Sequence, residues 1–363
     1  MATTYQPMPL GDVVRFGNGK SIKPGGEGHY PVYGSNGIIG GSDEYRHENG
    51  IIIGRVGAYC GAVAYCPERF WASDNTLVAF PASDAFDTKF LFYLLTDARL
   101  SRHAGGAAQP LVTQTVLKQV EVSVPPLPVQ RRIAGILSAY DDLIENNQRR
   151  IKILEEMARS LYREWFVHLR FPGHEKVTMV SSSLGPIPPG WEVKKLGDLA
   201  DISWGDTSTT KASYAEEGFA AYSASGLDGK LDHYDFDRTG IVLSAIGAQC
   251  GKTWLARGKW SCIKNTIRFW TKHESASTEF LFIATEGQAF WPRRGAAQPF
   301  ISQGDAERID LLTPDRATMK SFTTFAAVSL ERIAVLEAQN QNLRRTRDLL
   351  LPRLLSGQIP LSC

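Results

Sequence analysis

The sequence predicts an α+β fold in which two similar β-rich, mixed globular domains are separated by two long antiparallel coiled-coil helices. Three observations lead to this prediction: a phrase that recurs, further matches in register with it, and two long stretches with heptad spacing. The phrase "GGAAQPLVTQ" occupies residues 105–114, and "GAAQPFISQ" at residues 295–303 repeats it 189 positions later. The fold should therefore have a pseudo-two-fold internal repeat.

The repeat extends over both halves of the chain at a shift that stays between 186 and 190 residues. A period of this length is too long for a solenoid, so each copy is expected to be a domain. The matching phrases are "LGDVV" with "LGDLA", "YPVYGSNGIIG" with "FAAYSASGLDG", "GIIIGRVGAYCG" with "GIVLSAIGAQCG", and "DNTLVAF" with "KNTIRFW".

Each copy begins with a glycine-rich part in which short apolar runs are bounded by Gly, Pro and Asn. Such runs are typical of strands. One helix, "TKFLFYLLTDARLSRHA" at residues 88–104, interrupts them, and the Gln-Pro phrase follows it in a loop. The predicted globular domains cover residues 1–125 and 187–312, with a linker at residues 171–186.

Long helices are predicted for residues 126–170 and 313–363, because apolar residues recur there at alternating three- and four-residue spacing. A helix of roughly 38 residues would be about 57 Å long. Antiparallel packing of the two helices on each other is expected, with one globular domain at each end; the alternative is that they bind partner helices. The predicted seam consists of Ile136, Tyr140, Ile144, Asn147, Ile151, Leu154, Leu161, Ile333, Leu336, Asn340, Leu343 and Leu350.

Composition excludes several classes of protein. Hydrophobic residues make up 43% and charged residues 21% of the 363 positions, as in ordinary globular chains. We expect no membrane span and no signal peptide, because no apolar run approaches ~18 residues and the first residues are not basic. The five cysteines are scattered, which argues against a metal site and a disulfide framework. These features predict a cytoplasmic protein, with Cys60 and Cys250 as small core residues.

Two similar domains on a stiff spacer can measure the distance between two similar objects. Duplex DNA presents equivalent faces about 34 Å apart, so it is a suitable partner for such a ruler.

The residues also carry a family resemblance. "VPPLPVQRRIAGILSAYDDLIENNQRRIKILEEMARSLYREWFVHLRFPGHE" and "GPIPPGWEVKKLGDLADIS" closely resemble the specificity subunit of Type I restriction-modification systems. The resemblance covers essentially the whole chain, although "TPDRATMKSF" replaces the Pro-rich lead-in before the second helix. It implies that each globular domain is a target recognition domain for one half of a split site in double-stranded DNA. It also implies that the helices set the gap and dock two methyltransferase subunits.

The resemblance implies a non-catalytic chain, and the sequence agrees with this. The Pro-Pro pairs "VPPL" and "IPPG" lack the polar and aromatic neighbours of an adenine methyltransferase loop, and "GAQCGKT" is one residue short of a phosphate-binding loop. We therefore expect no cofactor and no metal in this chain. The resemblance places S-adenosylmethionine, Mg and ATP in the methyltransferase and restriction/translocase partner subunits.

The formal net charge is only +2. Residues 1–125 hold 10 basic and 11 acidic side chains, residues 187–312 hold 14 and 16, and the remaining segments hold 16 and 11. Phosphate contacts supply much of the affinity of proteins for DNA. The chain alone is therefore expected to bind DNA weakly.

Arg, Lys, Asn and Gln are the main side chains that read base edges, so the candidates are polar side chains in loops at which the two copies differ. Gln109 and Gln298 occur in both copies and are expected to fix the loop or contact the backbone. The DNA-binding candidates are Lys20, Lys23, Ser35, Asn36, Arg55, Arg102, His103 and Gln109, and Lys211, Ser225, Lys252, Arg257, Arg293, Arg294 and Gln298.

The sequence is also compatible with two other functions. Heptads and pseudo-symmetry would also suit a bivalent protein-binding scaffold without DNA specificity. A self-contained restriction-methylation enzyme is the other alternative, and the missing catalytic loops oppose it.

Overall fold

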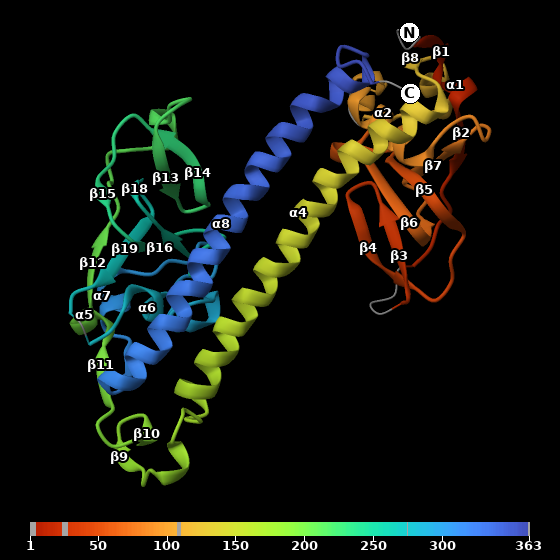
Figure 1. Ribbon diagram of the computed structural model, residues 1–363. Helices are drawn as coiled ribbons and strands as arrows, with labels where there is room; N and C mark the ends of the chain where they lie inside the picture. Colours follow the sequence, from red (N-terminus) through yellow and green to blue (C-terminus); the bar gives the residue numbers. More distant parts are fainter. Residues whose placement is uncertain (1–4, 24–27, 107–109, 274, 362–363) are drawn as a thin grey trace. The chain divides into compact units, whose positions relative to one another are not determined.

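The computed structural model describes residues 5–23, 28–106, 110–273 and 275–361. It divides into two compact units, Met1–Asn147 with Ala338–Cys363, and Gln148–Glu337. Each unit contains one globular domain and part of both long helices (Figure 1). None of the helices in the described part is apolar over a length that could cross a membrane.

Domain 1, from β1 to β8, is built on a six-stranded sheet with the order β2-β7-β5-β6-β3-β4. Strands β3 and β6 are parallel, and the other neighbours in this sheet are antiparallel. A separate antiparallel pair, β1 and β8, joins the two ends of the domain. The strands are β1 Gln6–Pro9, β2 Val14–Asn18, β3 Tyr30–Gly34, β4 Gly37–Ser42, β5 His47–Gly54, β6 Val63–Ala72, β7 Thr76–Pro81 and β8 Glu121–Val124.

In the described part of domain 1, three α-helices accompany the sheet: α1 Leu10–Val13, α2 Thr88–Asp97 and α3 Gln114–Lys118. Helix α2 starts where the Asp87 side chain accepts a hydrogen bond from the Phe90 amide, a common N-cap. The helix predicted for residues 88–104 is shorter in the structure, because Arg99 has a left-handed φ of 47° and a 3₁₀ turn, Leu100–His103, follows.

The core of domain 1 explains why the strand β5 is apolar at consecutive positions. Ile51 and Ile53 pack with α2 residues such as Phe90, whereas Ile52 lies in a second cluster with Phe70. Both faces of this strand are therefore buried, and no polar alternation is needed.

Domain 2, from β11 to β20, repeats this architecture with one difference. Its strands form two four-stranded sheets, β12-β19-β16-β17 and β14-β13-β18-β15, and β11 pairs with β20 as β1 does with β8. The strands are β11 Glu192–Lys195, β12 Ala200–Trp204, β13 Phe219–Ser223, β14 Gly226–Leu231, β15 Phe236–Asp237, β16 Gly240–Ser244, β17 Thr253–Ala256, β18 Lys259–Cys262, β19 Thr266–Thr271 and β20 Asp310–Thr313. The α-helices are α5 Leu196–Leu199, α6 Thr278–Ala284 and α7 Gln303–Glu307.

The sheet of domain 2 is divided because a continuous strand of domain 1 is interrupted there. Strand β6 has 10 residues, whereas its counterparts β17 and β18 are separated by Arg257 and Gly258. Gly258 has a φ of 63°, a conformation that glycine adopts without steric strain and that breaks a strand. The counterpart of β5 is divided as well, into β15 and β16, which Arg238 and Thr239 separate.

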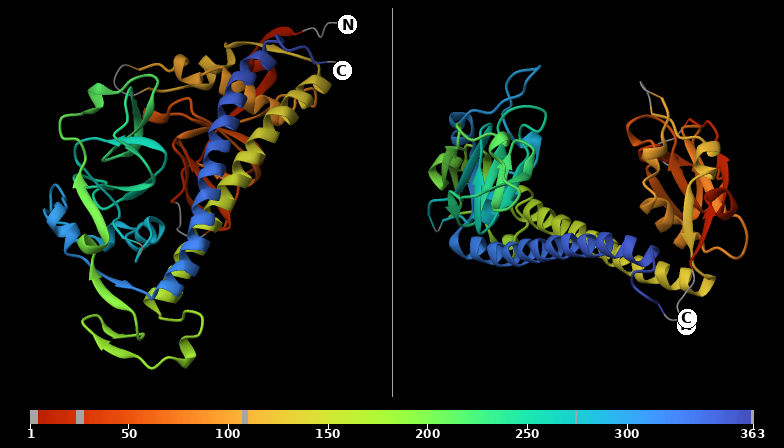
Figure 2. Two further views of the ribbon diagram at one scale, coloured as in Figure 1. Left: turned by 60° about the vertical axis from the view of Figure 1, so that its left-hand side comes forward. Right: turned by 90° about the horizontal axis from the view of Figure 1, so that it is seen from above.

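Helices α4, Leu127–Tyr162, and α8, Arg316–Leu355, run antiparallel and side by side (Figures 1 and 2). In the first unit the Asn147 amide donates to the Asn340 side-chain oxygen at 3.0 Å, and Asp141 pairs with Arg347 seven positions further along α8. In the second unit Trp165, in the π-helical turn Arg163–Val167 that extends α4, lies against Phe322 of α8. Residues that come earlier in α4 contact residues that come later in α8. The predicted antiparallel pairing of the two helices is therefore confirmed.

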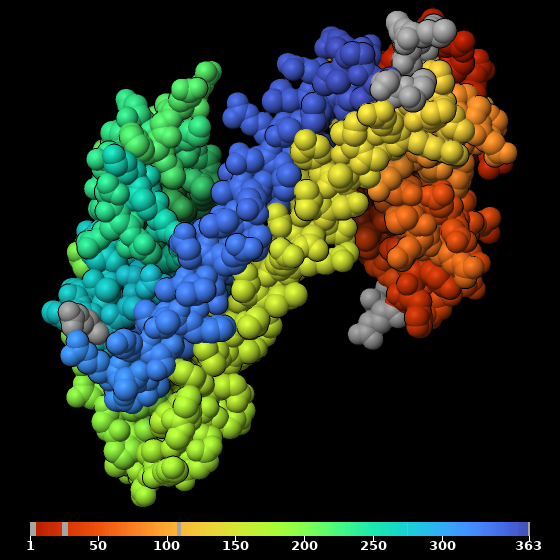
Figure 3. All heavy atoms as spheres, viewed as in Figure 1, coloured from red at the N-terminus to blue at the C-terminus, as the bar shows by residue number. Residues whose placement is uncertain are grey.

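The start of α4 lies against domain 1, as the space-filling view shows (Figure 3). The segment predicted as a linker contains a small hairpin, β9 Val180–Ser182 and β10 Gly185–Ile187.

All twelve predicted seam residues are buried or half-buried: Ile144, Asn147, Ile333, Leu336 and Asn340 are buried, and Ile136, Tyr140, Ile151, Leu154, Leu161, Leu343 and Leu350 are half-buried.

Candidate nucleic-acid interface

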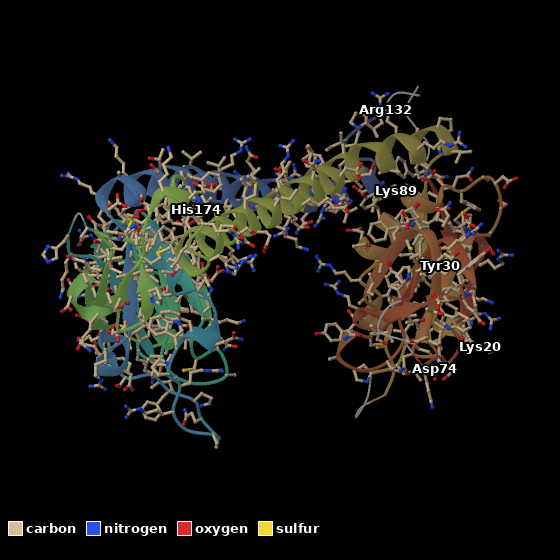
Figure 4. The ribbon with its side chains drawn as sticks, turned by 90° about the horizontal axis from the view of Figure 1, so that it is seen from below. Lys20, Tyr30, Asp74, Lys89, Arg132 and His174 are labelled. Atoms are coloured by element: carbon tan, nitrogen blue, oxygen red, sulfur yellow. The ribbon has the colours of Figure 1, made fainter. Side chains whose placement is uncertain are left out.

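One end of the sheet of domain 1 gathers several loops that are far apart in sequence. We call this surface loop edge 1 and define it as residues 18–20, 35–36, 55–59, 73–75 and 110. Lys20 and Asp74 lie at this end, whereas Lys89 lies nearer to the helix that carries Arg132 (Figure 4). The backbone bonds that hold the loops together are Lys20 N to Ala72 O at 2.9 Å, Arg55 N to Asn75 O at 2.9 Å, Ser73 N to Tyr33 O at 2.9 Å and Gly57 N to Pro110 O at 3.1 Å.

The same backbone network holds the corresponding loops of domain 2. We call this surface loop edge 2 and define it as residues 204–206, 224–225, 245–249, 263–265 and 299. Its bonds are Asp206 N to Cys262 O, Ala245 N to Asn265 O, Ile263 N to Tyr222 O and Gly247 N to Pro299 O, each 2.9 Å long. The network therefore makes pairs of positions equivalent: Lys20 and Asp206, Arg55 and Ala245, Tyr59 and Gln249, Asp74 and Lys264, and Asn75 and Asn265.

Paired glycines and cysteines explain why both sequences fold in this way. Gly61 and Gly251 have φ values of 81° and 93°, and a Cβ on Gly61 would lie 2.3 Å from the Ser101 nitrogen. Cys60 and Cys250 are 6% and 1% exposed, and their thiols donate to the carbonyl oxygens of the two equivalent edge residues. Burial raises the pKa of both thiols, which keeps them neutral. Their predicted role as small core residues is confirmed.

The structure brings four of the candidate DNA-binding residues of domain 1 to loop edge 1. Lys20 and Asn36 are exposed. Ser35 donates from its hydroxyl to the Asn75 carbonyl oxygen at 2.6 Å, which ties two loops together. Arg55 is half-buried, and its Nε is a buried nitrogen without a hydrogen-bond partner among the described residues.

The other candidates of domain 1 lie elsewhere. Lys23 and Arg102 are exposed outside loop edge 1. His103 lines a cavity of about 590 Å³ together with Leu355 and Ser356 of the α8 end, so it is not brought to the edge. Gln109 lies outside the described residues.

In domain 2 the candidates divide by their contacts. Ser225, Lys252, Arg293 and Gln298 are exposed, and Ser225 belongs to loop edge 2. Three others have acidic partners: Lys211 with Asp228, Arg257 with Glu331 of α8, and Arg294 with Asp305.

Sequence reasoning missed the pairs Asp74 with Lys264 and Tyr59 with Gln249. Asp74, Lys264 and Tyr59 are exposed on the two loop edges and Gln249 is half-buried, and the residue type differs between the copies in each pair. The alignment of "DNT" with "KNT" contained the first signal, but an acidic residue was not among the expected base readers. In the described part of the chain, no group of three or more His, Cys, Asp or Glu side chains is arranged to hold a metal ion.

Comparison with known proteins gives a consistent result. The family model for the Type I restriction modification DNA specificity domain matches residues 3–156 and 188–318, one match for each copy of the repeat. The Type I restriction enzyme MjaIX specificity subunit of Methanocaldococcus jannaschii is 24% identical over 304 residues, which cover 76% of this chain and 70% of that protein. The Type I restriction enzyme HindI specificity subunit of Haemophilus influenzae is 20% identical over 380 residues, covering 80% and 82%.

A solved structure shares the fold. The crystal structure of a Type I restriction-modification system S subunit from M. genitalium superimposes with a TM-score of 0.70 and 17% identity, covering 97% of this chain and 96% of that chain. The two family matches together span well over half of the sequence. The chain therefore belongs to the Type I restriction-modification DNA specificity family, and it is a non-catalytic subunit that recognises a DNA sequence.

Proposed function

We propose that domain 1 and domain 2 each read one half of a bipartite target in double-stranded DNA, through loop edge 1 and loop edge 2. The observation that carries this proposal is the shared backbone network, which presents different side chains at equivalent places in the two domains. Two domains with the same backbone arrangement but different side chains can recognise two different half-sites. The reason is that phosphate contacts position a protein on DNA, whereas side chains at base edges specify the sequence.

The antiparallel helices would set the number of base pairs between the half-sites and dock two methyltransferase subunits, which act with restriction/translocase subunits. S-adenosylmethionine, Mg and ATP would then belong to those partners. The four cysteines in the described residues are all unpaired, which agrees with action in the reducing cytoplasm, where chromosomal DNA is reached.

The test is to sequence methylated sites in cells with and without this gene. We expect a two-part motif with a fixed gap that disappears when the gene is deleted and returns when the full chain is restored. An unchanged set of methylated sites after deletion would contradict the proposal.

The scaffold alternative predicts a different result. A scaffold without DNA specificity would retain its protein partners after nuclease treatment and would protect no particular DNA sequence. Sequence-dependent protection by the purified complex would favour the proposed function.

A further inference from the structure

We infer that Asp74 and Lys264 determine which base is accepted at one position of each half-site: Asp74 selects a base with an exocyclic amino group, adenine or cytosine, and Lys264 selects guanine. The inference rests on the proposed function and assigns a role in it to one pair of equivalent residues.

Each of these residues lies at the tip of a tight turn between two strands. In domain 1 the Thr76 amide donates to the Ser73 carbonyl oxygen at 3.0 Å, and the Thr76 hydroxyl donates to the same oxygen at 2.7 Å. In domain 2 the Thr266 hydroxyl donates to the Ile263 carbonyl oxygen in the same way. Both threonines are completely buried. These hydrogen bonds with the buried threonines fix the backbone of the turn in both copies.

Hydrogen bonds with neighbouring loops also hold the two turns in place. The Asn75 carbonyl oxygen accepts hydrogen bonds from the Arg55 amide and the Ser35 hydroxyl, and the Asn265 carbonyl oxygen accepts one from the Ala245 amide. A side chain on such a turn loses little additional backbone freedom when it binds. Precise placement by rigid supporting elements is what a specificity contact needs.

The two side chains are free to meet a ligand. Asp74 and Lys264 are exposed, and neither side chain has a hydrogen bond or an ion pair with any described residue. In this respect Lys264 differs from Lys211 and Arg294, two basic candidates of domain 2 whose charges are paired with acidic residues.

The opposite charges exclude a shared role in contacting the DNA backbone. A phosphate contact would require a positive or neutral donor in both copies, and a carboxylate facing phosphates would be repelled. In the major groove a carboxylate can accept a hydrogen bond from cytosine N4 or adenine N6, whereas lysine donates to guanine O6 and N7. Asp74 on a DNA-binding edge is therefore explained by a base that carries an amino group, and Lys264 by guanine.

The experiment exchanges the two charges one at a time in the full chain, produced together with its partner subunits, and sequences the methylated sites. We expect Asp74→Lys to reduce methylation of the original sites at least about fivefold and to change one base in one half of the motif. We expect Lys264→Asp to change one base in the other half. The gap and the untouched half should stay the same in each case.

Asp84→Lys is the matched control, because it makes the same charge change in the same domain beyond the opposite end of β7. It should leave the motif unchanged. Asp74→Asn keeps the shape of the side chain and adds a donor, so it should favour adenine without loss of the complex. If Asp74→Lys lowers methylation equally at all sites while the motif stays the same, or has no effect, the inference is wrong. Absence of any two-part motif for the unaltered complex would instead refute the proposed function.

Discussion

Asn147 and Asn340 interrupt the apolar seam between α4 and α8 with a buried hydrogen bond. They are 8% and 4% exposed, and the bond between their side chains is 3.0 Å long. A buried amide that loses its partner costs about 1–3 kcal/mol, which exceeds the net gain from forming the bond. The pair therefore favours the one alignment of the helices in which both amides meet, as polar residues do in other coiled coils.

Replacing one asparagine should cost more than replacing both. We expect Asn340→Leu to lower the unfolding free energy of the first unit by about 1–3 kcal/mol, because Asn147 is left without a partner. The double variant Asn147→Leu with Asn340→Leu should recover most of this loss, since leucine fills the seam. Thermal unfolding of the full chain measures both effects, and a double variant as unstable as the single one would contradict the expectation.

Asp206 contributes stability that depends on pH. Its carboxylate accepts hydrogen bonds from the Thr209 hydroxyl and from the hydroxyl and amide of Ser208, and these bonds lower its pKa from 3.8 to about 2. A lowered folded-state pKa means that the contribution is complete above the unfolded value and is lost as the pH falls from 3.8 towards 2. The stability difference between the native chain and Asp206→Ala should therefore be constant near neutral pH and shrink below pH 4, as pH-dependent urea unfolding would show.

At the scale of elements, Asp141 ties domain 1 to both long helices. It lies on α4, accepts a hydrogen bond from the Tyr93 hydroxyl of α2, and pairs with Arg347 of α8. Arg257 and Glu331 make a comparable tie in the second unit, but the Glu331 side chain is 68% exposed, against 31% for Asp141. Solvent screens exposed pairs, so the two ties should differ in strength.

Alanine variants can compare these two ties. We expect Asp141→Ala to destabilise the first unit by about 1–3 kcal/mol, because two hydrogen bonds to a charged group are lost. Glu331→Ala should cost less than about 1 kcal/mol in the second unit. Thermal unfolding of the two full-length variants measures the difference. Equal losses would show that burial does not control the strength of these contacts.

The long helices could be predicted from the sequence because the spacing of their apolar residues indicates which face of each helix is buried. Strand boundaries were harder to predict, since the division of β6 into β17 and β18 depends on the backbone conformation of two residues, Arg257 and Gly258. The helix after β7 was predicted too long because the left-handed Arg99 ends it early, and the turn that follows brings the Ser101 backbone close to Gly61.

At the scale of the molecule, the repeat predicted the two domains but only part of the candidate interface. Lys20, Ser35, Asn36 and Arg55 meet on one edge because hydrogen bonds join four separate loops, and no phrase in the sequence specifies those bonds. Arg257 and Arg294 matched the expected residue types, yet each has an acidic partner within the chain. Residue type indicates what a side chain can bind, whereas the fold decides which charges are already paired.

The balance of charge leads to a prediction for the whole chain. Residues 1–125 carry one more acidic than basic side chain, and residues 187–312 carry two more. Basic residues are thus not in excess on either domain, and several of those that are present pair with acidic residues. Because neutralisation of phosphates supplies most non-specific affinity, the isolated chain should bind DNA weakly and with a shallow dependence on salt. Partner subunits that surround the duplex would add the missing phosphate contacts.

Gel-shift titrations at several salt concentrations can separate these contributions. We expect the complex with the methyltransferase subunits to bind its target far more tightly than the chain alone, and log affinity to fall more steeply with log salt, since the slope reports the number of neutralised phosphates. Asp74→Lys and Lys264→Asp should change the sequence preference of the complex and leave its salt slope changed by no more than about one unit. Tight, sequence-specific binding by the isolated chain would mean that the two loop edges make the phosphate contacts themselves, and the partners would then be needed for catalysis alone.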